Sequence, residues 1–206
     1  MRIIKETSFR ELNRAYVFIS LGDVSFLDQF FDNTAESNGI LTYGFIDHEN
    51  GICFEILCCG FYDSEKHGIK LYSSNDNVRI TMSYDQLVDA EYMFLSENIL
   101  CKETFKTKVD KIVDSHNVTE TVEKARNITA IDGCRIEGCP DDVIVYLVKG
   151  NDYYETISVR LEDVGKMDLI GVMLEEPEKD FGVHCGDTIH FFIVKNEQGI
   201  MCMASF

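Results

Sequence analysis

Five short apolar runs, separated by turn residues, lie in the C-terminal part of the chain and constrain its fold most strongly. They span residues 143–148, 154–161, 169–174, 188–194 and 200–204. Apolar and polar side chains alternate along most of them, as in strands that bury one face. Polar turns at residues 150–152 and 196–199, and Pro177 at a strand end, favour short connections between neighbouring strands. The pattern predicts a five-stranded β unit, either a small barrel or a curled sheet.

The alternation also predicts which side chains of this unit form its apolar inner face. The expected set is Val143, Val145, Leu147, Ile157, Val159, Leu161, Ile170, Val172, Leu174, Ile189, Phe191 and Ile193. Because every connection is short, we expect residues 129–206 to fold as a β unit on their own, although about 78 residues give a marginal core.

The first part of the chain shows a similar succession of β-like runs, at residues 16–21, 40–46, 52–58, 69–72 and 78–82. The polar segments 47–51 and 73–77 between them are typical of hairpin loops. Ser8 with Glu11 matches a capping box, and residues 25–28 suggest a second short helix. The pattern predicts an antiparallel meander with short helices.

At Ser83, between the two β-rich parts, the sequence pattern changes from β-like runs to a helical one. Ser83 and Gln86 match another capping box, and no Gly or Pro follows until Gly133. We therefore expect two or three helices within residues 84–128. The prediction is an α+β chain with an N-terminal domain at 1–128, ending in the helical segment, and a β-rich domain at 129–206.

The net charge of the chain limits the classes of molecule that it is expected to bind. The chain has 36 acidic and 19 basic side chains, a net charge of −17 that repels the phosphates of nucleic acids and anionic membranes. Both β-rich parts are acidic, whereas the helical residues 101–128 are nearly neutral.

The eight cysteines suggest either a disulfide scaffold or a reduced, cytoplasmic protein. The N-terminus is polar and lacks the features of a signal peptide, and no apolar run is long enough to span a bilayer. We therefore expect a cytoplasmic protein with reduced thiols.

The best candidate metal ligands are Cys134 and Cys139, with His184, Cys185 and His190 from the same part of the chain. Their spacing differs from the C-x2-C pairs of structural zinc sites, and adjacent residues such as His184 and Cys185 point apart on a strand. Buried or incidental thiols are the favoured interpretation, and we expect no stoichiometric zinc.

Other residues that could take part in catalysis or metal binding are likewise interpreted as structural or solvent-exposed. Cys58 and Cys59 are adjacent, so on a strand they face apart and are expected to be structural. The acid pairs Asp141-Asp142, Glu162-Asp163 and Glu175-Glu176 are expected at the solvated surface. Since phosphate-loop, dinucleotide, hydrolase-elbow and zinc-protease motifs are all missing, we assign no catalytic, cofactor-binding or metal-binding residue.

One stretch, about residues 155–190, contains a recognisable series of short sequence motifs. It contains Val159-Arg160-Leu161, Glu176-Pro177, Asp180 to His184, and Gly186-Asp187. This stretch resembles a small β-rich bacterial domain of unknown function, found alone or after a variable N-terminal part. The resemblance implies a β fold and a bacterial origin, and it transfers no catalytic residue.

Two functional hypotheses follow. The first is a non-enzymatic bacterial module whose acidic faces recognise a basic protein partner, as an immunity protein neutralises a toxin. The alternative is a small-molecule or metal-dependent enzyme with its site between the two β-rich units. A deep pocket lined by His184, Cys185 and carboxylates, or a co-purifying metal, would favour the enzyme, and a shallow acidic face with no convergent polar cluster would favour the binding module. Acidity that serves solubility alone explains the charge equally well.

Overall fold

The chain folds as an α+β protein with an N-terminal curled antiparallel sheet, a helical connector and a C-terminal closed five-stranded barrel. The computed structural model describes residues 1–75, 77–95, 99–150, 153–197 and 199–206. It divides into two compact units, residues 1–117 and 118–206. The predicted fold class is confirmed, and of the two architectures proposed for the C-terminal part the barrel is the one found.

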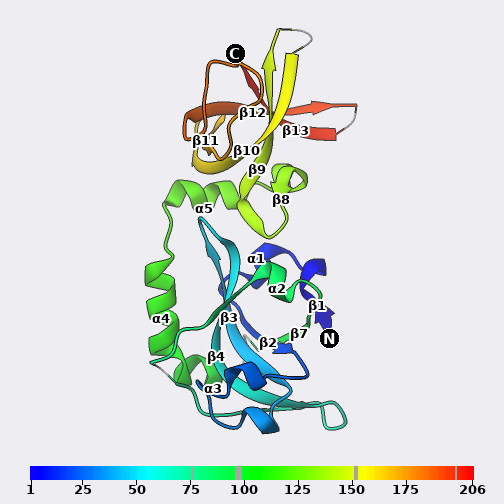
Figure 1. The fold of residues 1–206 in the computed structure, drawn as a ribbon, viewed down its shortest axis with the longest axis vertical. Helices are drawn as coiled ribbons and strands as arrows, with labels where there is room; N and C mark the ends of the chain where they lie inside the picture. The colour runs from blue at the N-terminus through cyan, green and yellow to red at the C-terminus, as the bar shows by residue number, and fades with distance from the viewer. Residues whose placement is uncertain (76, 96–98, 151–152, 198) are drawn as a thin grey trace. The chain divides into compact units, whose positions relative to one another are not determined.

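The N-terminal unit is built on a seven-stranded sheet in the order β1-β7-β2-β3-β4-β5, with β6 also paired to β4 (Figure 1). All its pairings are antiparallel. Its strands are β1 (Arg2–Ile3), β2 (Tyr16–Ser20), β3 (Gly39–Asp47), β4 (Gly51–Asp63), β5 (Gly68–Leu71), β6 (Thr81–Ser83) and β7 (Glu91–Phe94). Its helices are η1 (Ile4–Glu6), α1 (Phe9–Leu12), η2 (Ser25–Leu27), η3 (Thr34–Glu36), α2 (Tyr84–Leu87), α3 (Ile99–Thr104) and α4 (Lys106–Ser115).

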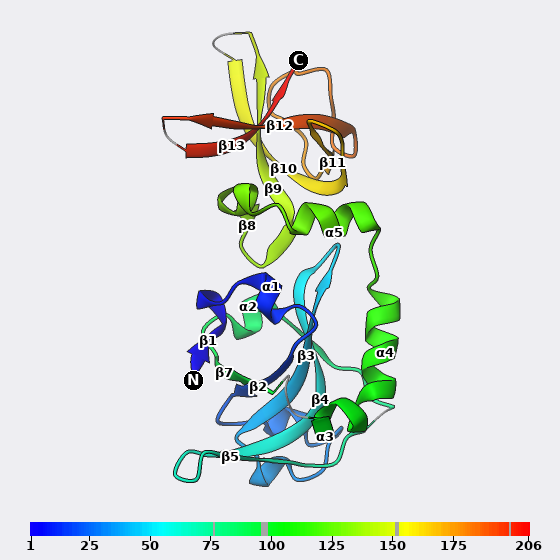
Figure 2. The same cartoon turned by 180° about the vertical axis from the view of Figure 1, so that it is seen from behind.

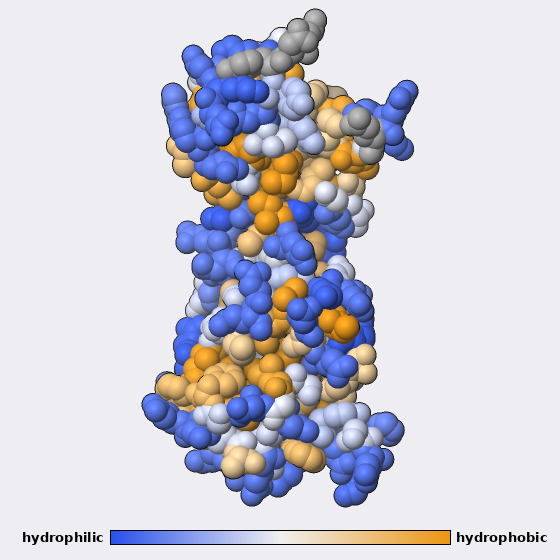
Figure 3. Space-filling model, turned by 45° about the vertical axis from the view of Figure 1, so that its right-hand side comes forward, coloured by the Kyte–Doolittle hydropathy of each residue, from blue (hydrophilic) through white to orange (hydrophobic). Residues whose placement is uncertain are grey.

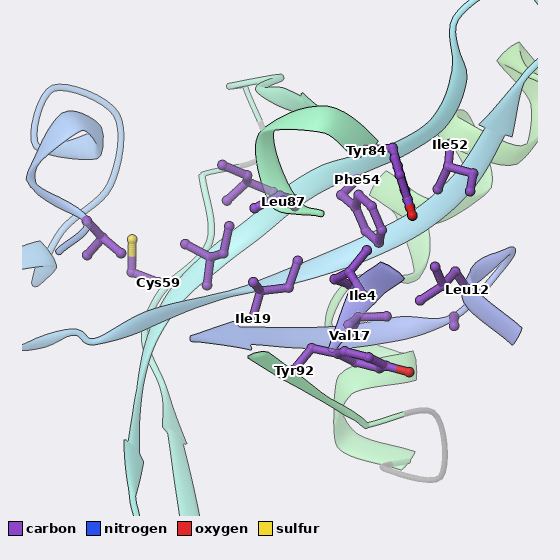
Figure 4. Packing of buried hydrophobic residues seen from close by; sticks show 14 of the residues in the cluster. Ile4, Leu12, Val17, Ile19, Ile52, Phe54, Cys59, Tyr84, Leu87 and Tyr92 are labelled. Atoms are coloured by element: carbon purple, nitrogen blue, oxygen red, sulfur yellow. The ribbon is translucent and has the colours of Figure 1, made fainter. Parts of the chain in front are cut away.

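One face of this sheet is covered by the short helices that precede and follow its strands. Leu12 from α1, and Tyr84 and Leu87 from α2, pack with Val17 and Phe54 of the sheet in a continuous apolar core (Figure 4). The predicted capping box fixes the start of α2, because Ser83 and Gln86 satisfy each other's backbone donors.

The opposite face is covered by α4, which runs alongside the sheet (Figure 2). Phe105, Val109 and Ile112 recur at helical spacing and pack on aromatic side chains of β2 and β3. In β4, the consecutive residues Leu57 and Cys58 both belong to this second core, because the pairing of β3 with β4 shifts register beside them.

The strand β7 lies within residues 84–128, where the sequence predicted two or three helices and no strand. It inserts between β1 and β2, and Tyr92, opposite Ile19, is fully buried. The absence of Gly and Pro permits a helix without enforcing one, and here burial of Tyr92 outweighs local propensity. The strand predicted at 78–82 corresponds to β6, which is shorter and begins only at Thr81.

The C-terminal unit is a barrel of five strands that close on themselves. Its elements are α5 (Glu120–Arg126), η4 (Thr129–Cys134), β8 (Arg135–Ile136), β9 (Cys139–Lys149), β10 (Tyr153–Val164), β11 (Leu169–Met173), β12 (Thr188–Asn196) and β13 (Gly199–Ser205). Successive strands from β9 to β13 pair antiparallel, so the first and fifth run in the same direction and close the barrel as a parallel pair.

The predicted inner face is confirmed on β9 and β10 and is wrong on β11. All six residues predicted to face inward on β9 and β10 are buried. On β12, Ile189 and Phe191 are buried, whereas Ile193 is exposed. On β11 the inward residues are Leu169, Gly171 and Met173. This strand is apolar at every position, so alternation could not choose its face. Position 171 requires glycine, because a Cβ there would lie 2.4 Å from the Arg160 carbonyl oxygen.

Helix α5 belongs to the C-terminal unit, so the division between units precedes the predicted boundary at 128/129. Val122 and Ala125 of α5 are buried, and Arg126 forms a bidentate ion pair with Asp141 of β9, with N–O distances of 2.8 and 2.6 Å. Both charged residues are buried. The helix therefore supplies the counterion for a carboxylate of the barrel.

We expect a fragment of residues 118–206 to be markedly more stable than the fragment 129–206 predicted from the sequence. Without α5, Asp141 lacks Arg126, and breaking a buried ion pair costs about 3–5 kcal/mol. Urea unfolding and amide dispersion in NMR spectra of the two fragments would measure the difference. Equal stability would show that α5 contributes nothing to the barrel.

Candidate functional site

The segment between β2 and β3 is the most distinctive part of the N-terminal surface. Val24, Leu27 and Phe31 are buried in the first core and hold this segment against the sheet. The segment exposes small or neutral side chains, Ser25, Gln29, Asn33 and Ala35, and a set of acidic and aromatic ones. We call this set the 23–36 surface, and it consists of Asp23, Phe26, Asp28, Phe30, Asp32 and Glu36.

The sequence around this surface carries charge of one sign, and the cation that approaches Glu36 in space, Lys70, comes from β5. From residue 15 to residue 65 the sequence contains nine acidic side chains and neither Lys nor Arg. Phe26 and Phe30 are 53% and 41% exposed among the carboxylates. Exposed aromatic rings next to carboxylates suit the guanidinium and ammonium groups of Arg and Lys, which bind carboxylates and stack on aromatic faces.

Local hydrogen bonds hold several carboxylates of the 23–36 surface in position. Asp23 accepts the backbone N–H of Ser25 at 2.9 Å, and this bond lowers the pKa of Asp23 below its ordinary value. Asp28 accepts the hydroxyl of Thr34. Glu36 lies 3.1 Å from the Tyr72 hydroxyl and 3.7 Å from the Lys70 ammonium. Asp23, Asp28 and Glu36 are therefore held in place by groups of the same unit.

The residues considered as metal ligands lie at different places in the barrel unit. Cys134 is buried, and its thiol lies 3.6 Å from the Ile200 carbonyl oxygen. Cys185 is exposed, and its thiol lies 3.9 Å from the Met173 carbonyl oxygen. Among the described residues, no group of three His, Cys, Asp or Glu side chains is arranged to hold a metal ion. The absence of zinc remains a prediction for metal analysis.

His184 and Cys185 lie in the loop before β12, outside the strand predicted at 188–194. Glu176 contacts both, because its carboxylate bonds to His184 Nδ1 at 2.7 Å and accepts the N–H of Cys185 at 2.8 Å. The bond to Glu176 raises the pKa of His184 and lowers that of Glu176. His190 is separate and pairs with Asp168 at 2.6 Å. These bonds order the loop between β11 and β12.

The adjacent thiols Cys58 and Cys59 face apart, as predicted. Cys58 belongs to the core under α4 and Cys59 to the core on the opposite face. Burial raises the pKa of Cys59 to about 11, with a smaller contribution from Asp28. Burial likewise raises the pKa of Cys202 to about 12, with neighbouring Cys134 adding to the shift. Both are therefore protonated at neutral pH and poor nucleophiles.

The prediction of solvated acid pairs is wrong for Asp141-Asp142. Asp141 pairs with Arg126, and Asp142 pairs with Arg160 at 2.8 Å, and both carboxylates are buried. The sequence could not identify these partners because they lie far from the pair along the chain. Glu162, Glu175 and Glu176 are exposed, in agreement with the prediction.

A second buried charge pair joins α4 to the N-terminal sheet. Glu55 of β4 is fully buried, and its Oε1 lies 3.9 Å from the ammonium of Lys108. Lys108 donates to the carbonyl oxygens of Ile56 and Val78, at 2.9 and 2.8 Å, and Thr81 donates to Glu55 Oε2. Oε1 of Glu55 has no hydrogen-bond partner within the described part of the chain. The arrangement anchors α4 and leaves one polar atom unsatisfied.

Comparison of the chain with protein-family models, with curated proteins and with solved structures finds no match in any of the three. Over the described ranges, no helix is both long enough and apolar enough to span a membrane.

We expect Lys108→Met to destabilise the chain by up to about 3–5 kcal/mol, because it removes one of the two cations that the structure describes beside the buried Glu55 carboxylate and leaves Arg79, whose Nε lies 3.8 Å from Oε1. The double variant Lys108→Met/Glu55→Gln should recover part of this loss. Urea unfolding measures both effects, and a double variant no more stable than Lys108→Met would show that the pair contributes no charge interaction.

The His184 to Glu176 bond predicts a pH-dependent contact. Because the pKa of His184 is raised above about 6.5, the ion pair is complete below that pH and is lost as pH rises through the raised pKa. NMR titration of His184 should show this pKa falling in Glu176→Gln and unchanged in Glu178→Gln. An unaltered pKa in Glu176→Gln would contradict the assignment.

Proposed function

We propose that this chain is a non-enzymatic bacterial protein of the cytoplasm that binds a basic protein partner, as an immunity protein binds its toxin. The observation that carries the proposal is the 23–36 surface, where exposed Phe rings stand among carboxylates in a stretch without Lys or Arg. The bacterial origin rests on the resemblance of residues 155–190 to a bacterial β-rich domain and remains part of the proposal.

The two kinds of side chain on this surface have different roles in binding. The carboxylates attract a cationic partner over a distance and raise the association rate, an effect that salt screens beyond about 8 Å at physiological ionic strength. Phe26 and Phe30 offer apolar area that becomes buried on contact and slows dissociation. Together they favour a basic protein with exposed Arg or Lys.

The net charge of −17 supports a protein partner over a nucleic acid. A nucleic-acid binder neutralises phosphates with Lys and Arg, and the 23–36 surface offers carboxylates instead. Arg and Lys side chains of a partner would form charge-assisted hydrogen bonds with the ordered carboxylates of Asp23 and Asp28.

The partner is to be identified by affinity capture with the intact chain and then purified for kinetics. We expect its association rate to fall steeply between low and physiological salt. Asp32→Lys should lower that rate, whereas Asp114→Lys, the same charge change at an exposed position on α4, should lower it less. Phe26→Ser should mainly raise the dissociation rate.

Stopped-flow or surface-based binding measurements distinguish the possible outcomes. Equal effects of Asp32→Lys and Asp114→Lys would mean that net charge alone acts and that the 23–36 surface is not the site. A salt-independent association rate, or a captured partner that is acidic, would overturn the proposal.

A further inference from the structure

The outer wall of the barrel carries an apolar surface formed by neighbouring strands β9, β13 and β12. We call it the barrel face, and it consists of Ile144, Tyr146, Phe192, Val194, Met201 and Met203. These side chains point outward, because Val145 and Cys202, which alternate with them, are buried inside the barrel. Figure 3, which turns the side of the β12–β13 hairpin forward, shows hydrophobic side chains at the surface of this unit.

The strand register makes this surface continuous. Met203 lies opposite both Tyr146 and Phe192, and Met201 lies opposite Val194. Phe192 is 48% exposed, and the other five side chains are half-buried. On the neighbouring strand β10, Thr156 opposite Tyr146 and Ser158 opposite Ile144 are uncharged, and the wall ends at the ion pair of Arg160 with Asp142. In a chain with 27% charged residues, a continuous uncharged wall is a candidate contact surface.

An acidic loop lies at one end of the barrel face, where it contacts residues that follow Tyr146 and Met203 along their strands. Residues 174–187 connect β11 to β12 and contain five acidic side chains, with Lys179 as their one Lys or Arg. The ammonium of Lys179 donates to the Tyr154 carbonyl oxygen, and Lys149 donates to that of Asp180, so the loop runs beside the adjoining ends of β9 and β10. Phe181 of the loop packs against Phe206, directly after β13.

Hydrogen bonds hold the acidic loop 174–187 in place. Glu155 accepts the N–H groups of Glu178 and Lys179, at 2.7 and 3.1 Å, and Glu176 holds His184 and Cys185. Since carboxylates bind the loop to itself and to β10, negative charge is held next to an apolar wall. A ligand that matches both needs apolar side chains on one side and cations at its edge.

We propose that the barrel face binds an amphipathic segment of a basic protein partner, with its apolar side on Phe192, Met203 and Tyr146 and its Lys or Arg side chains toward the loop 174–187. This inference rests on the proposed function and adds the apolar half of the recognition. Methionines suit such a site because their flexible side chains adapt to the shape of the incoming segment.

Charge complementarity selects this occupant over a second copy of the chain. Two copies meeting at their barrel faces would bring two acidic loops together in molecules that each carry −17. A cationic segment instead lowers the charge of the complex as it covers the apolar wall.

A synthetic amphipathic peptide of Leu and Lys, labelled for fluorescence anisotropy, tests the inference on the intact chain. The matched control peptide has Glu in place of every Lys. We expect the Lys peptide to bind and the Glu peptide not to bind. Phe192→Ser should weaken binding about tenfold, whereas Met167→Ser, at an 89% exposed residue of the same unit, should change it less than twofold. Met203→Ser provides a second variant if Phe192→Ser misfolds.

Every outcome decides for or against the barrel face. Unchanged affinity in Phe192→Ser and Met203→Ser, equal binding of the two peptides, or loss of binding only in Asp32→Lys would overturn it. A wild-type dimer in sedimentation that Phe192→Ser converts to a monomer would make a second copy the occupant and also overturn it. None of these results bears on the salt-dependent binding of a basic partner, which tests the proposed function separately.

Discussion

The parallel pairing of β13 with β9 determines how the C-terminal unit is built. Five strands in an antiparallel succession leave the first and last running in the same direction, so the barrel closes only if those two pair in parallel. Closure removes the free edges that an open sheet would expose to other chains. It also places Tyr146 of β9 beside Met203 of β13, and so unites the outward side chains of strands far apart in sequence into one surface. The face proposed for binding exists because the barrel is closed.

Both units attach a helix to a sheet with a buried pair of opposite charges. Arg126 reaches Asp141 from α5, and Lys108 reaches Glu55 from α4. Because a buried charge without its partner is costly, any shift of the helix that separated the pair would be unfavourable. The Arg126 pair is bidentate, while Glu55 keeps one oxygen without a hydrogen bond, so the α4 anchor is the less complete of the two.

The fold class could be predicted because strands that bury one face alternate in sequence, as β9 and β10 do. Prediction failed where that signal is missing or misleading. The apolar run of β11 does not indicate which of its side chains face inward. The strand β7 lies in a stretch whose lack of Gly and Pro indicated helix. The partners of Asp141 and Asp142 are determined by tertiary contacts that no local pattern records. Charge counted over the first 100 residues also hid the 23–36 surface, which a shorter window without Lys or Arg would have revealed.

The distribution of charge bears on the selectivity that we propose for the exposed apolar and aromatic side chains. Phe26, Phe30 and Phe192 would each promote association with any apolar surface if they stood alone. Carboxylates accompany them in both units, around the N-terminal rings and in the loop beside the barrel face. A neutral or acidic protein gains the apolar contact but must desolvate or repel these carboxylates, whereas a basic protein gains from both. Acidity that serves solubility alone would not require exposed rings beside ordered carboxylates, and this pairing is the physical reason to prefer recognition of a basic partner.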